Sequence, residues 1–225
     1  CYRAAGTAAW NSGYSMQTPS LEINGTYGLI SDRESNSAVI FSESGGLQGT
    51  ISTTESIIDA TVSAHGVAAL LLDDGDAGII QFYNKDGSKL DISIRTALSG
   101  DGFPLEIALS PAGTTLMASM VYLENGSLQN RVVFFNFETG KTSSDRIVGY
   151  FKYDSSLFAR IGFLSDTEAC AVADDQICFY SIKDESSPQA VSSVKCGSEI
   201  KSVSLGSGRI GVLMEGTNQN NQVCL

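Results

Sequence analysis

Acidic side chains gather in the turns of this sequence, and their carboxylates could bind a cation or a basic peptide. The densest group is Asp73-Asp74-Gly75-Asp76. Further acids recur in turns along the chain: Asp32, Glu34, Glu124, Asp174, Asp175 and Glu215. Calcium prefers such oxygen ligands, which makes it a candidate cofactor. The Asp-Asp-Gly-Asp spacing lacks the rest of a calcium loop, however, and Asp also favours turns for conformational reasons, so no metal ligands are assigned.

Groups that could carry catalysis are scarce. The chain has a single histidine, His65, at the third position of a turn spanning Ser63 to Gly66. A Ser-His-Asp triad would have to use this exposed turn residue, and a centre with several histidine ligands is excluded. We therefore predict no catalytic residues. The alternative is a hydrolase or lyase that uses paired carboxylates, as glycoside hydrolases do, although no pair stands out.

The five cysteines show no metal-ligand spacing. They are Cys1, Cys170, Cys178, Cys196 and Cys224. Cys170 and Cys178 fall on neighbouring predicted strands and could face each other as a disulfide across a hairpin. The alternative is that both are free thiols, which behave as small buried apolar residues.

Composition excludes several classes of partner. With 14 basic and 25 acidic residues among 225, the net charge is −11, and such a surface repels phosphate backbones. We expect no nucleic-acid partner. No apolar run approaches the roughly 20 residues of a membrane span, so we expect no direct membrane contact by this segment. The hydrophobic fraction of 42% is enough for one domain with a sizeable core.

The elements that position these residues follow a motif that repeats about every 40 to 50 residues. A first strand ends in an apolar anchor and a tight turn follows. A second apolar strand comes next, then an aromatic and β-branched third strand, then a more polar fourth segment. The five anchors are Ile23, Val62, Leu109, Phe163 and Leu205. Helical spacing of apolar residues is hard to find, so the chain is predicted to be all-β.

Four strands per repeat indicate a β-propeller of four-stranded antiparallel blades. About five blades are visible in a single domain over residues 1–225. The expected blade units are residues 19–54, 56–96, 103–152 and 157–196, with a partial blade over 199–225 that residues 1–16 complete. One interpretation is a ring closed by this shared blade, which leaves no exposed strand edge. The other is a fragment of a six- or seven-bladed propeller.

The propeller phase places the acidic turns on one face. Loops from second to third strands, and from fourth strands to the next blade, open on that face, and it holds all nine acids named above. Only Arg33 is expected to offset them. The opposite turns are mixed: Arg3, Lys85, Lys89, Lys141, Arg146, Lys183 and Arg209 lie among Glu43, Asp86, Asp145 and Asp184. The nine acids are the candidate binding residues, and a basic protein or peptide is the expected ligand of that face.

Several segments resemble a known family. Leu109-Ser110-Pro111-Ala112-Gly113-Thr114, the run Arg131 to Phe137 and Tyr2 to Met16 with its central Trp10 look like an uncharacterised family of WD-like β-propeller domains from Gram-positive anaerobic bacteria. In that family a membrane helix typically precedes the propeller, which implies an extracytoplasmic location and an anchor upstream of this chain. The family's usual Asp after Ser-Pro is Ala112 here. The family has no assigned catalytic residues to carry over, and we predict a non-catalytic binding or sensing module.

Overall fold

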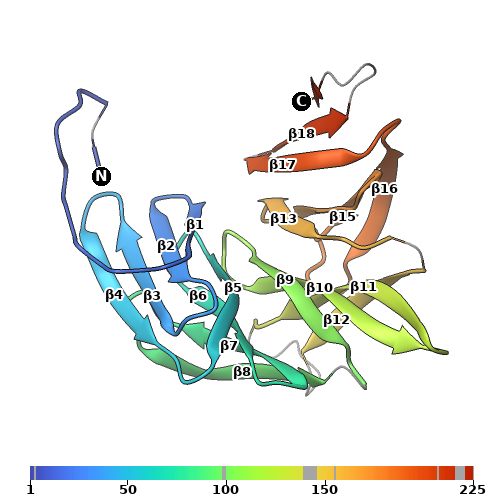
Figure 1. The fold of residues 1–225 in the computed structure, drawn as a ribbon, viewed down its shortest axis with the longest axis horizontal. Helices are drawn as coiled ribbons and strands as arrows, with labels where there is room; N and C mark the ends of the chain where they lie inside the picture. The colour runs from blue at the N-terminus through green and yellow to red at the C-terminus, as the bar shows by residue number, and fades with distance from the viewer. Residues whose placement is uncertain are drawn as a thin grey trace. The chain divides into compact units, whose positions relative to one another are not determined.

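The computed structural model describes residues 1–2, 4–97, 100–138, 146–154, 156–206, 208–215 and 221–224. These residues form nineteen β-strands, and they contain no helix long and apolar enough to cross a bilayer. The strands make five antiparallel sheets in chain order (Figure 1). The prediction of an all-β chain is confirmed.

Four sheets contain four strands each and the fifth contains three described strands. The first sheet consists of β1 (Pro19–Asn24), β2 (Tyr27–Asp32), β3 (Ser37–Ser42) and β4 (Gly46–Ser52). The second consists of β5 (Ser56–Val62), β6 (Ala68–Asp73), β7 (Ala77–Tyr83) and β8 (Lys89–Ala97). The third consists of β9 (Phe103–Leu109), β10 (Thr115–Glu124), β11 (Ser127–Asn136) and β12 (Ile147–Tyr153). The fourth consists of β13 (Arg160–Ser165), β14 (Glu168–Val172), β15 (Gln176–Ser181) and β16 (Gln189–Lys195). The fifth consists of β17 (Ile200–Gly206), β18 (Arg209–Glu215) and β19 (Asn221–Cys224).

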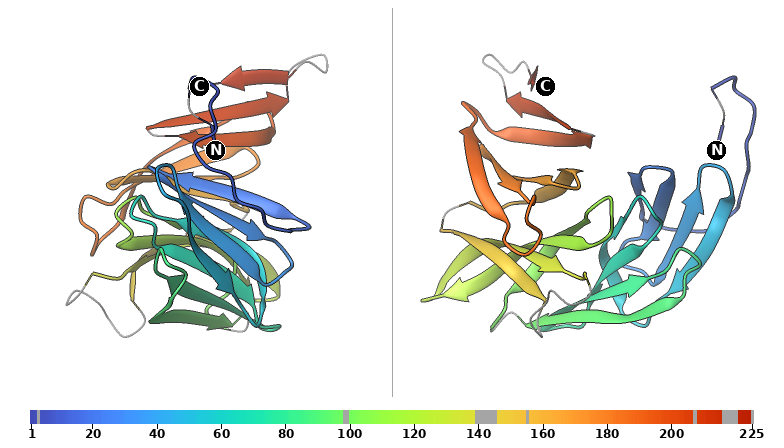
Figure 2. Two further views of the ribbon diagram at one scale, coloured as in Figure 1. Left: turned by 90° about the vertical axis from the view of Figure 1, so that its left-hand side faces the viewer. Right: turned by 180° about the vertical axis from the view of Figure 1, so that it is seen from behind.

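Within each sheet the strands pair with their neighbours in sequence, because tight turns join them. The longest hairpin, β10–β11, turns at Asn125-Gly126, with φ values of 52° and 78°. Positive φ at both central residues is the type I′ turn that matches the twist of a hairpin, and Asn-Gly is its preferred sequence. Figure 2 shows this up-and-down order from two further sides.

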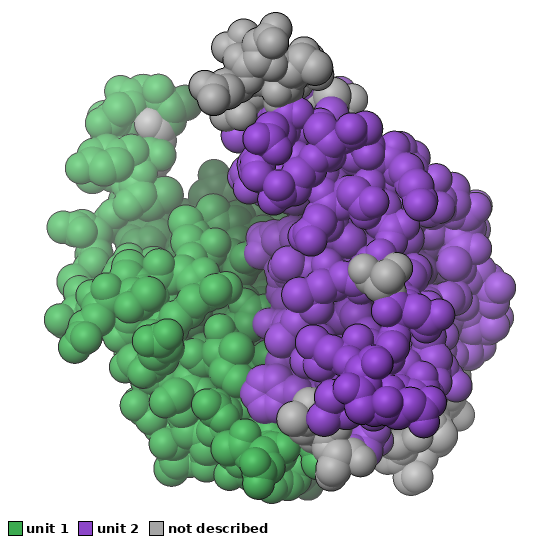
Figure 3. All heavy atoms as spheres, turned by 45° about the vertical axis from the view of Figure 1, so that its right-hand side comes forward, with its two compact units in different colours: residues 1–97, 111–113 green, residues 98–110, 114–225 purple. Residues whose placement is uncertain are grey.

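The chain divides into two compact units, which are coloured in Figure 3. Unit 1 comprises residues 1–97 and 111–113. Its core lies between the first and second sheets, where Leu29 and Ile40 pack with Ile57 and Leu70. The turn that contains Pro111 belongs to this unit, since the Ala64 amide donates to the Pro111 carbonyl at 2.9 Å.

Unit 2 comprises residues 98–110 and 114–225, and its described residues include two hydrophobic clusters. One lies between the third and fourth sheets and includes Phe134 and Tyr180. The other lies between the fourth and fifth sheets and includes Cys170, Ile177 and Val212. Since side chains alternate between the faces of a strand, one sheet supplies residues to both cores.

The N-terminal segment contacts the first sheet of unit 1 through Trp10. Tyr2 forms a bridge with Ala8. The Trp10 ring lies 5.5 Å from the Phe41 ring, and its Nε1 donates to the Glu43 carbonyl at 3.1 Å. The two Trp10 contacts fix this residue against strand β3 and the turn that follows it.

Candidate functional site

The nine predicted binding acids occupy hairpin ends and loops, but their local roles differ. Asp32 is buried, and its Oδ1 accepts hydrogen bonds from the amides of Gln17 and Thr18 at 3.0 and 2.7 Å. Glu34 is exposed in the left-handed region with φ of 61°, and its amide donates to the Ile57 carbonyl. The Asp32 carboxylate therefore holds the chain that enters β1, whereas Glu34 holds its turn against β5 through the backbone.

The β6–β7 turn carries the densest acidic group. Asp73 Oδ1 accepts from the Gly75 amide at 3.0 Å, as Asp does in hairpin turns. Asp74 Oδ2 lies 2.6 Å from Arg95 Nη1. Asp76 is exposed. In the part of the chain that the structure describes, no three acidic, histidine or cysteine side chains are grouped as metal ligands would be.

Basic residues of other strands offset more of the acids than the sequence indicated. Lys152 lies 3.2 Å from Glu124, and Lys201 lies 3.8 Å from Glu215 and 2.6 Å from Glu199. With Arg95, these lysines correct the expectation that Arg33 alone offsets the acids. The cause is the antiparallel order, which brings basic residues of β8, β12 and β17 beside the acidic loops.

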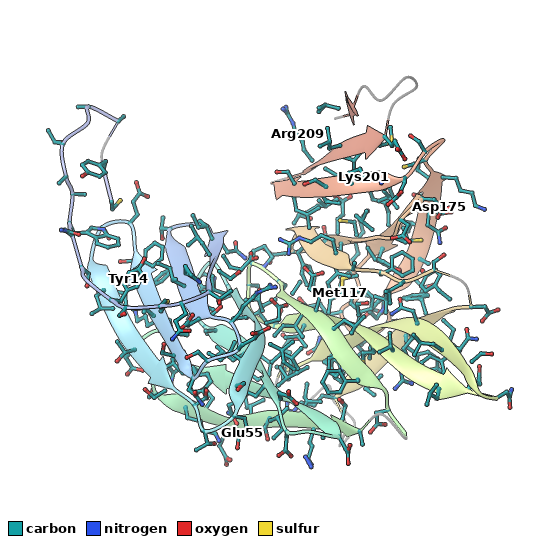
Figure 4. All side chains as sticks on the ribbon, viewed as in Figure 1. Tyr14, Glu55, Met117, Asp175, Lys201 and Arg209 are labelled. Carbon is teal, nitrogen blue, oxygen red and sulfur yellow. The ribbon has the colours of Figure 1, made fainter. Side chains whose placement is uncertain are left out.

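Asp174 and Asp175 form the β14–β15 turn, and both side chains are exposed. Their carbonyls accept from the amides of Ile200 and Cys196 at 2.7 Å each, which ties the turn to the chain entering the fifth sheet. Figure 4 labels Asp175 near the end of β16. Of the opposite turns, Arg3, Lys141 and Asp145 lie outside the described residues.

Two buried carboxylates that the sequence interpretation missed lie on first strands. Asp59 of β5 lies 3.0 Å from Arg33, and Glu106 of β9 lies 2.7 Å from Arg160 of β13. Asp59, Glu106 and Arg160 each stand three residues before the anchor of their strand, so the repeat alignment could have found them. Each carboxylate forms an ion pair with a guanidinium rather than a pair with the other carboxylate.

The single histidine is exposed in its turn, as the sequence indicated. The Ser63 hydroxyl accepts from the His65 amide at 3.3 Å and from the Val67 amide at 3.1 Å. Ser63 therefore stabilises the turn.

Of the two alternatives that the sequence left open for Cys170 and Cys178, the structure has the free thiols. Cys178 pairs in register with Ala171, so Cys170 projects from the opposite face of the fourth sheet. Cys170 packs toward the fifth sheet and Cys178 toward the third, and both are free thiols. The one-residue offset cannot be seen in the sequence, because both residues fall on apolar strands. Burial raises the pKa of Cys170 to about 12.

A hydrogen-bonded tyrosine pair lies in the core between the third and fourth sheets. The hydroxyls of Tyr153 and Tyr180 are 2.6 Å apart. Burial raises the pKa of both phenols above their usual range, so they remain protonated in the folded protein. Their position within the core indicates a packing role.

A groove of about 520 Å³ lies between the fourth and fifth sheets of unit 2. Its volume falls in the range of small-molecule and peptide-anchor sites. Apolar residues line most of it: Leu164 of β13, Ile177 and Phe179 of β15, Val194 of β16, and Ile210, Val212 and Met214 of β18. Lys195 and Arg209 also line it. The sequence interpretation missed this groove, because no turn motif marks it.

A second hollow of about 370 Å³ lies at the loop ends of the third and fourth sheets. Its lining is polar and mixed in charge, with Lys152 and Lys195 beside Asp154 and Asp175. Since neither sign dominates there, the hollow lacks the single-sign field that would select a charged ligand.

Many solved structures share the fold of this chain, and two of them show the degree of similarity. One is described as the complex of KlAtg21 with the coiled-coil of AgAtg16, with a TM-score of 0.63, 13% identity, and coverage of 94% of this chain and 71% of that chain. The other is the Dos1 propeller, with a TM-score of 0.59, 9% identity, and coverage of 88% of this chain and 50% of that chain. Such identities show the fold alone, and the predicted β-propeller of four-stranded antiparallel blades is confirmed.

Sequence comparison defines the family. No curated protein matches the chain. A family model described as "Family of unknown function (DUF5711)" matches residues 1–225. The chain therefore belongs to this family of unknown function.

Proposed function

We propose that this chain is a non-catalytic β-propeller module that binds a protein partner. The observation that carries the proposal is the groove between the fourth and fifth sheets, whose apolar lining is open to solvent in a protein of net charge −11. Apolar surface at a concave site gains free energy when a ligand removes it from water.

The competing function is a carboxylate-based hydrolase or lyase. It needs two carboxylates of which one stays protonated to act as the acid. The two buried carboxylates on first strands, Asp59 and Glu106, each lie within 3.0 Å of an arginine. This pairing supports the non-catalytic proposal.

Selection from a random peptide library displayed on phage tests the binding function. The folded chain is immobilised, and an unrelated acidic protein of similar size serves as the counter-selection. A recurring sequence pattern that enriches only on the folded chain is the expected result. Failure to enrich any pattern in repeated selections would contradict the proposal.

The acidic loops remain a proposed site for a basic partner or for calcium. The acids with exposed side chains on the β6–β7 and β14–β15 turns support the basic-partner version. Thermal melts with calcium, with chelator and with a basic peptide test it, since a ligand of the folded state raises the midpoint. Replacing Asp73, Asp74 and Asp76 by Asn should abolish any rise.

An extracytoplasmic location, with the chain held by an upstream membrane anchor, is proposed from the family resemblance. Cys1 is exposed, whereas Cys170 and Cys178 are buried. A membrane-impermeant maleimide added to intact producing cells should therefore label Cys1 in the native protein. Labelling that requires cell lysis would contradict the location.

A further inference from the structure

The β10–β11 hairpin of unit 2 is longer than the strands on either side of it. In the described chain, β9 pairs with β10 as far as Val121, and β12 pairs with β11 from Asn130 onward. Pairing between β10 and β11 continues beyond these points to Glu124 and Ser127 at the turn. Residues 122–129 therefore extend past the rest of the third sheet as a two-stranded ribbon, an arrangement that has little stability of its own in water.

The two faces of this ribbon differ in how far their large side chains are covered. On one face the Tyr122 ring is 7% exposed, with Arg131 at 5.3 Å and Lys152 at 5.4 Å from the ring centre. On the other face Leu123 and Leu128, which are direct cross-strand partners, are 60% and 61% exposed. Cations thus lie over the aromatic ring, whereas the two leucines are open to solvent.

The open leucines lie on the side of the hairpin that faces the fourth sheet. Leu128 shares its face of β11 with Val132 and Phe134, which belong to the core between the third and fourth sheets. Leu157, in the segment that leads into β13, is 43% exposed and lines a hollow of about 150 Å³ together with Leu128. Among the described residues of unit 2, the exposed leucines are Leu123, Leu128 and Leu157 and no others. We call these three residues the leucine patch.

The hollow beside the leucine patch has the size of a site for one side chain. Its volume of about 150 Å³ is below the roughly 300–1,000 Å³ of small-molecule pockets. Asp154 is the one charged residue in its described lining, and the same residue lines the neighbouring hollow of about 370 Å³. Asp154 is exposed, and among the described residues it has no ion-pair partner within 4.0 Å. An apolar hollow therefore stands next to an unpaired negative charge.

Charge favours one class of occupant for this surface. The chain carries a net charge of −11, so it repels anionic lipid headgroups, anionic amphiphiles and a second copy of itself. A basic segment of another protein is attracted both by the whole chain and by Asp154. An apolar side chain that fills a pocket is also the kind of residue that carries most of the binding energy at protein interfaces.

We propose that the leucine patch and its hollow bind a segment of a partner protein that presents an apolar side chain close to a basic one. The apolar side chain enters the hollow between Leu128 and Leu157, and the basic side chain pairs with Asp154. Contact of the same segment with Leu123 covers the open face of the ribbon. This inference rests on the proposed protein-binding function and adds a contact surface apart from the groove between the fourth and fifth sheets.

Peptide selection on two forms of the chain tests the proposal. The probe is a random peptide library displayed on phage, selected in parallel on the wild-type chain and on the double variant Leu128→Ser with Leu157→Ser. The double variant removes apolar contact area without changing the charge. We expect peptides that enrich on the wild-type chain alone and that carry Lys or Arg beside an apolar residue. Thermal midpoints verify that both forms fold.

Fluorescence anisotropy of the enriched peptides, synthesised with a label, locates the contact. Leu128→Ser should weaken their binding at least about tenfold, because an apolar contact is lost. Val191→Ser is the matched control: it is 59% exposed in the same unit, lies outside the hollow, and should change binding less than about twofold. Asp154→Asn should weaken binding about threefold or more and reduce its dependence on salt, whereas Asp91→Asn, at an exposed position of β8, should do neither.

The outcomes separate this inference from the binding function itself. Enriched peptides that bind Leu128→Ser as tightly as the wild-type chain would overturn the inference and leave the function standing, and loss of their binding in Val194→Ser would assign them to the groove. No enrichment on the wild-type chain would overturn both. If Leu128→Ser instead abolished binding to phosphatidylcholine vesicles or self-association of the chain, the patch would belong to a bilayer or to a second copy, and the proposal would fail.

Discussion

Replacing Asn130 by Ala should destabilise unit 2 strongly, because this side chain ties the third sheet to the segment that leads into the fourth. Asn130 is 3% exposed; its Nδ2 donates to Ser119 Oγ at 3.2 Å and to the Met120 carbonyl at 2.8 Å. Its Oδ1 accepts from the Phe158 amide at 3.3 Å, and Ser119 Oγ donates to the Phe158 carbonyl at 2.6 Å. The network is buried and joins the third sheet to the segment that precedes β13.

The magnitude follows from the groups left without partners. The Ala variant orphans the buried Phe158 N–H and removes the donor to the Met120 carbonyl, and each such buried group costs about 1–3 kcal/mol. We expect a loss of about 3 kcal/mol in the free energy of unfolding. For a chain of this size that corresponds to a fall of about 6–12 °C in the thermal midpoint.

Urea and thermal unfolding followed by far-UV circular dichroism measure this loss. Asn36→Ala is the control, since the Asn36 amide makes an exposed hydrogen bond to the Thr54 carbonyl and should cost less than about 1 kcal/mol. A double-variant cycle with Ser119→Ala should show coupling of about 1 kcal/mol, as members of one network do. An Asn130→Ala variant no less stable than Asn36→Ala would refute the reasoning.

Three further predictions concern thiols, close contacts and turns. Cys170 and Cys178 should resist a thiol reagent at pH 8 in the native protein and react after unfolding; reaction of both at the rate of Cys1 would show that the core opens. The pKa of Cys170 in the folded protein, about 12, lies above its value in the unfolded chain. The contribution of this thiol to the free energy of unfolding is therefore complete below about pH 8.5 and is lost as the pH rises toward 12, by on the order of 1 kcal/mol per pH unit. Cys170→Ala should reduce this dependence of stability on pH, measured by urea unfolding. Gly49→Ala should lower the thermal midpoint, because the new Cβ would clash with the backbone of Asp86. Gly197→Ala adds a Cβ in open space and should leave the midpoint within about 2 °C. Equal effects would show that the backbone beside β4 moves to accommodate the new methyl group. Asp32→Ala should lower the free energy of unfolding by about 1–2 kcal/mol, because it removes the acceptor of two backbone hydrogen bonds. Asp76→Ala, at an exposed position, should lower it by less than about 0.5 kcal/mol in the same chemical denaturation. Equal losses would contradict the role of Asp32 as a hydrogen-bond acceptor for the Gln17 and Thr18 amides.

The fold was readable from the sequence because a repeated local pattern determines each hairpin. The anchors Val62 and Leu109 are 2% and 3% exposed, as buried anchors should be. Ile23 occupies the same repeat position but is 64% exposed. A strand pattern predicts which face a side chain occupies, whereas burial also depends on whether another sheet covers that face.

The site was less readable because its contacts join distant positions. Glu106 and Arg160 are 54 residues apart and meet through two first strands. The acidic turns were found because they are local, but their partners Arg95 and Lys152 come from fourth strands. The sequence could not decide between a disulfide and two free thiols for Cys170 and Cys178 for a related reason: a shift of one residue in strand register moves a side chain to the opposite face, and composition does not encode register.

The placement of the cores between sheets has a consequence for how this chain can be shortened. Since the described clusters are each built from two neighbouring sheets, a single sheet carries only half of a core. Unfolding free energy should then behave as a sum over sheet-to-sheet interfaces, as in repeat proteins. Cutting the chain after Gly197 would remove Val203, Leu205 and Val212 from Ile177 and Phe179, and the newly exposed face would favour aggregation. Truncations that end at a sheet boundary are therefore no safer than others unless a polar cap replaces the lost neighbour.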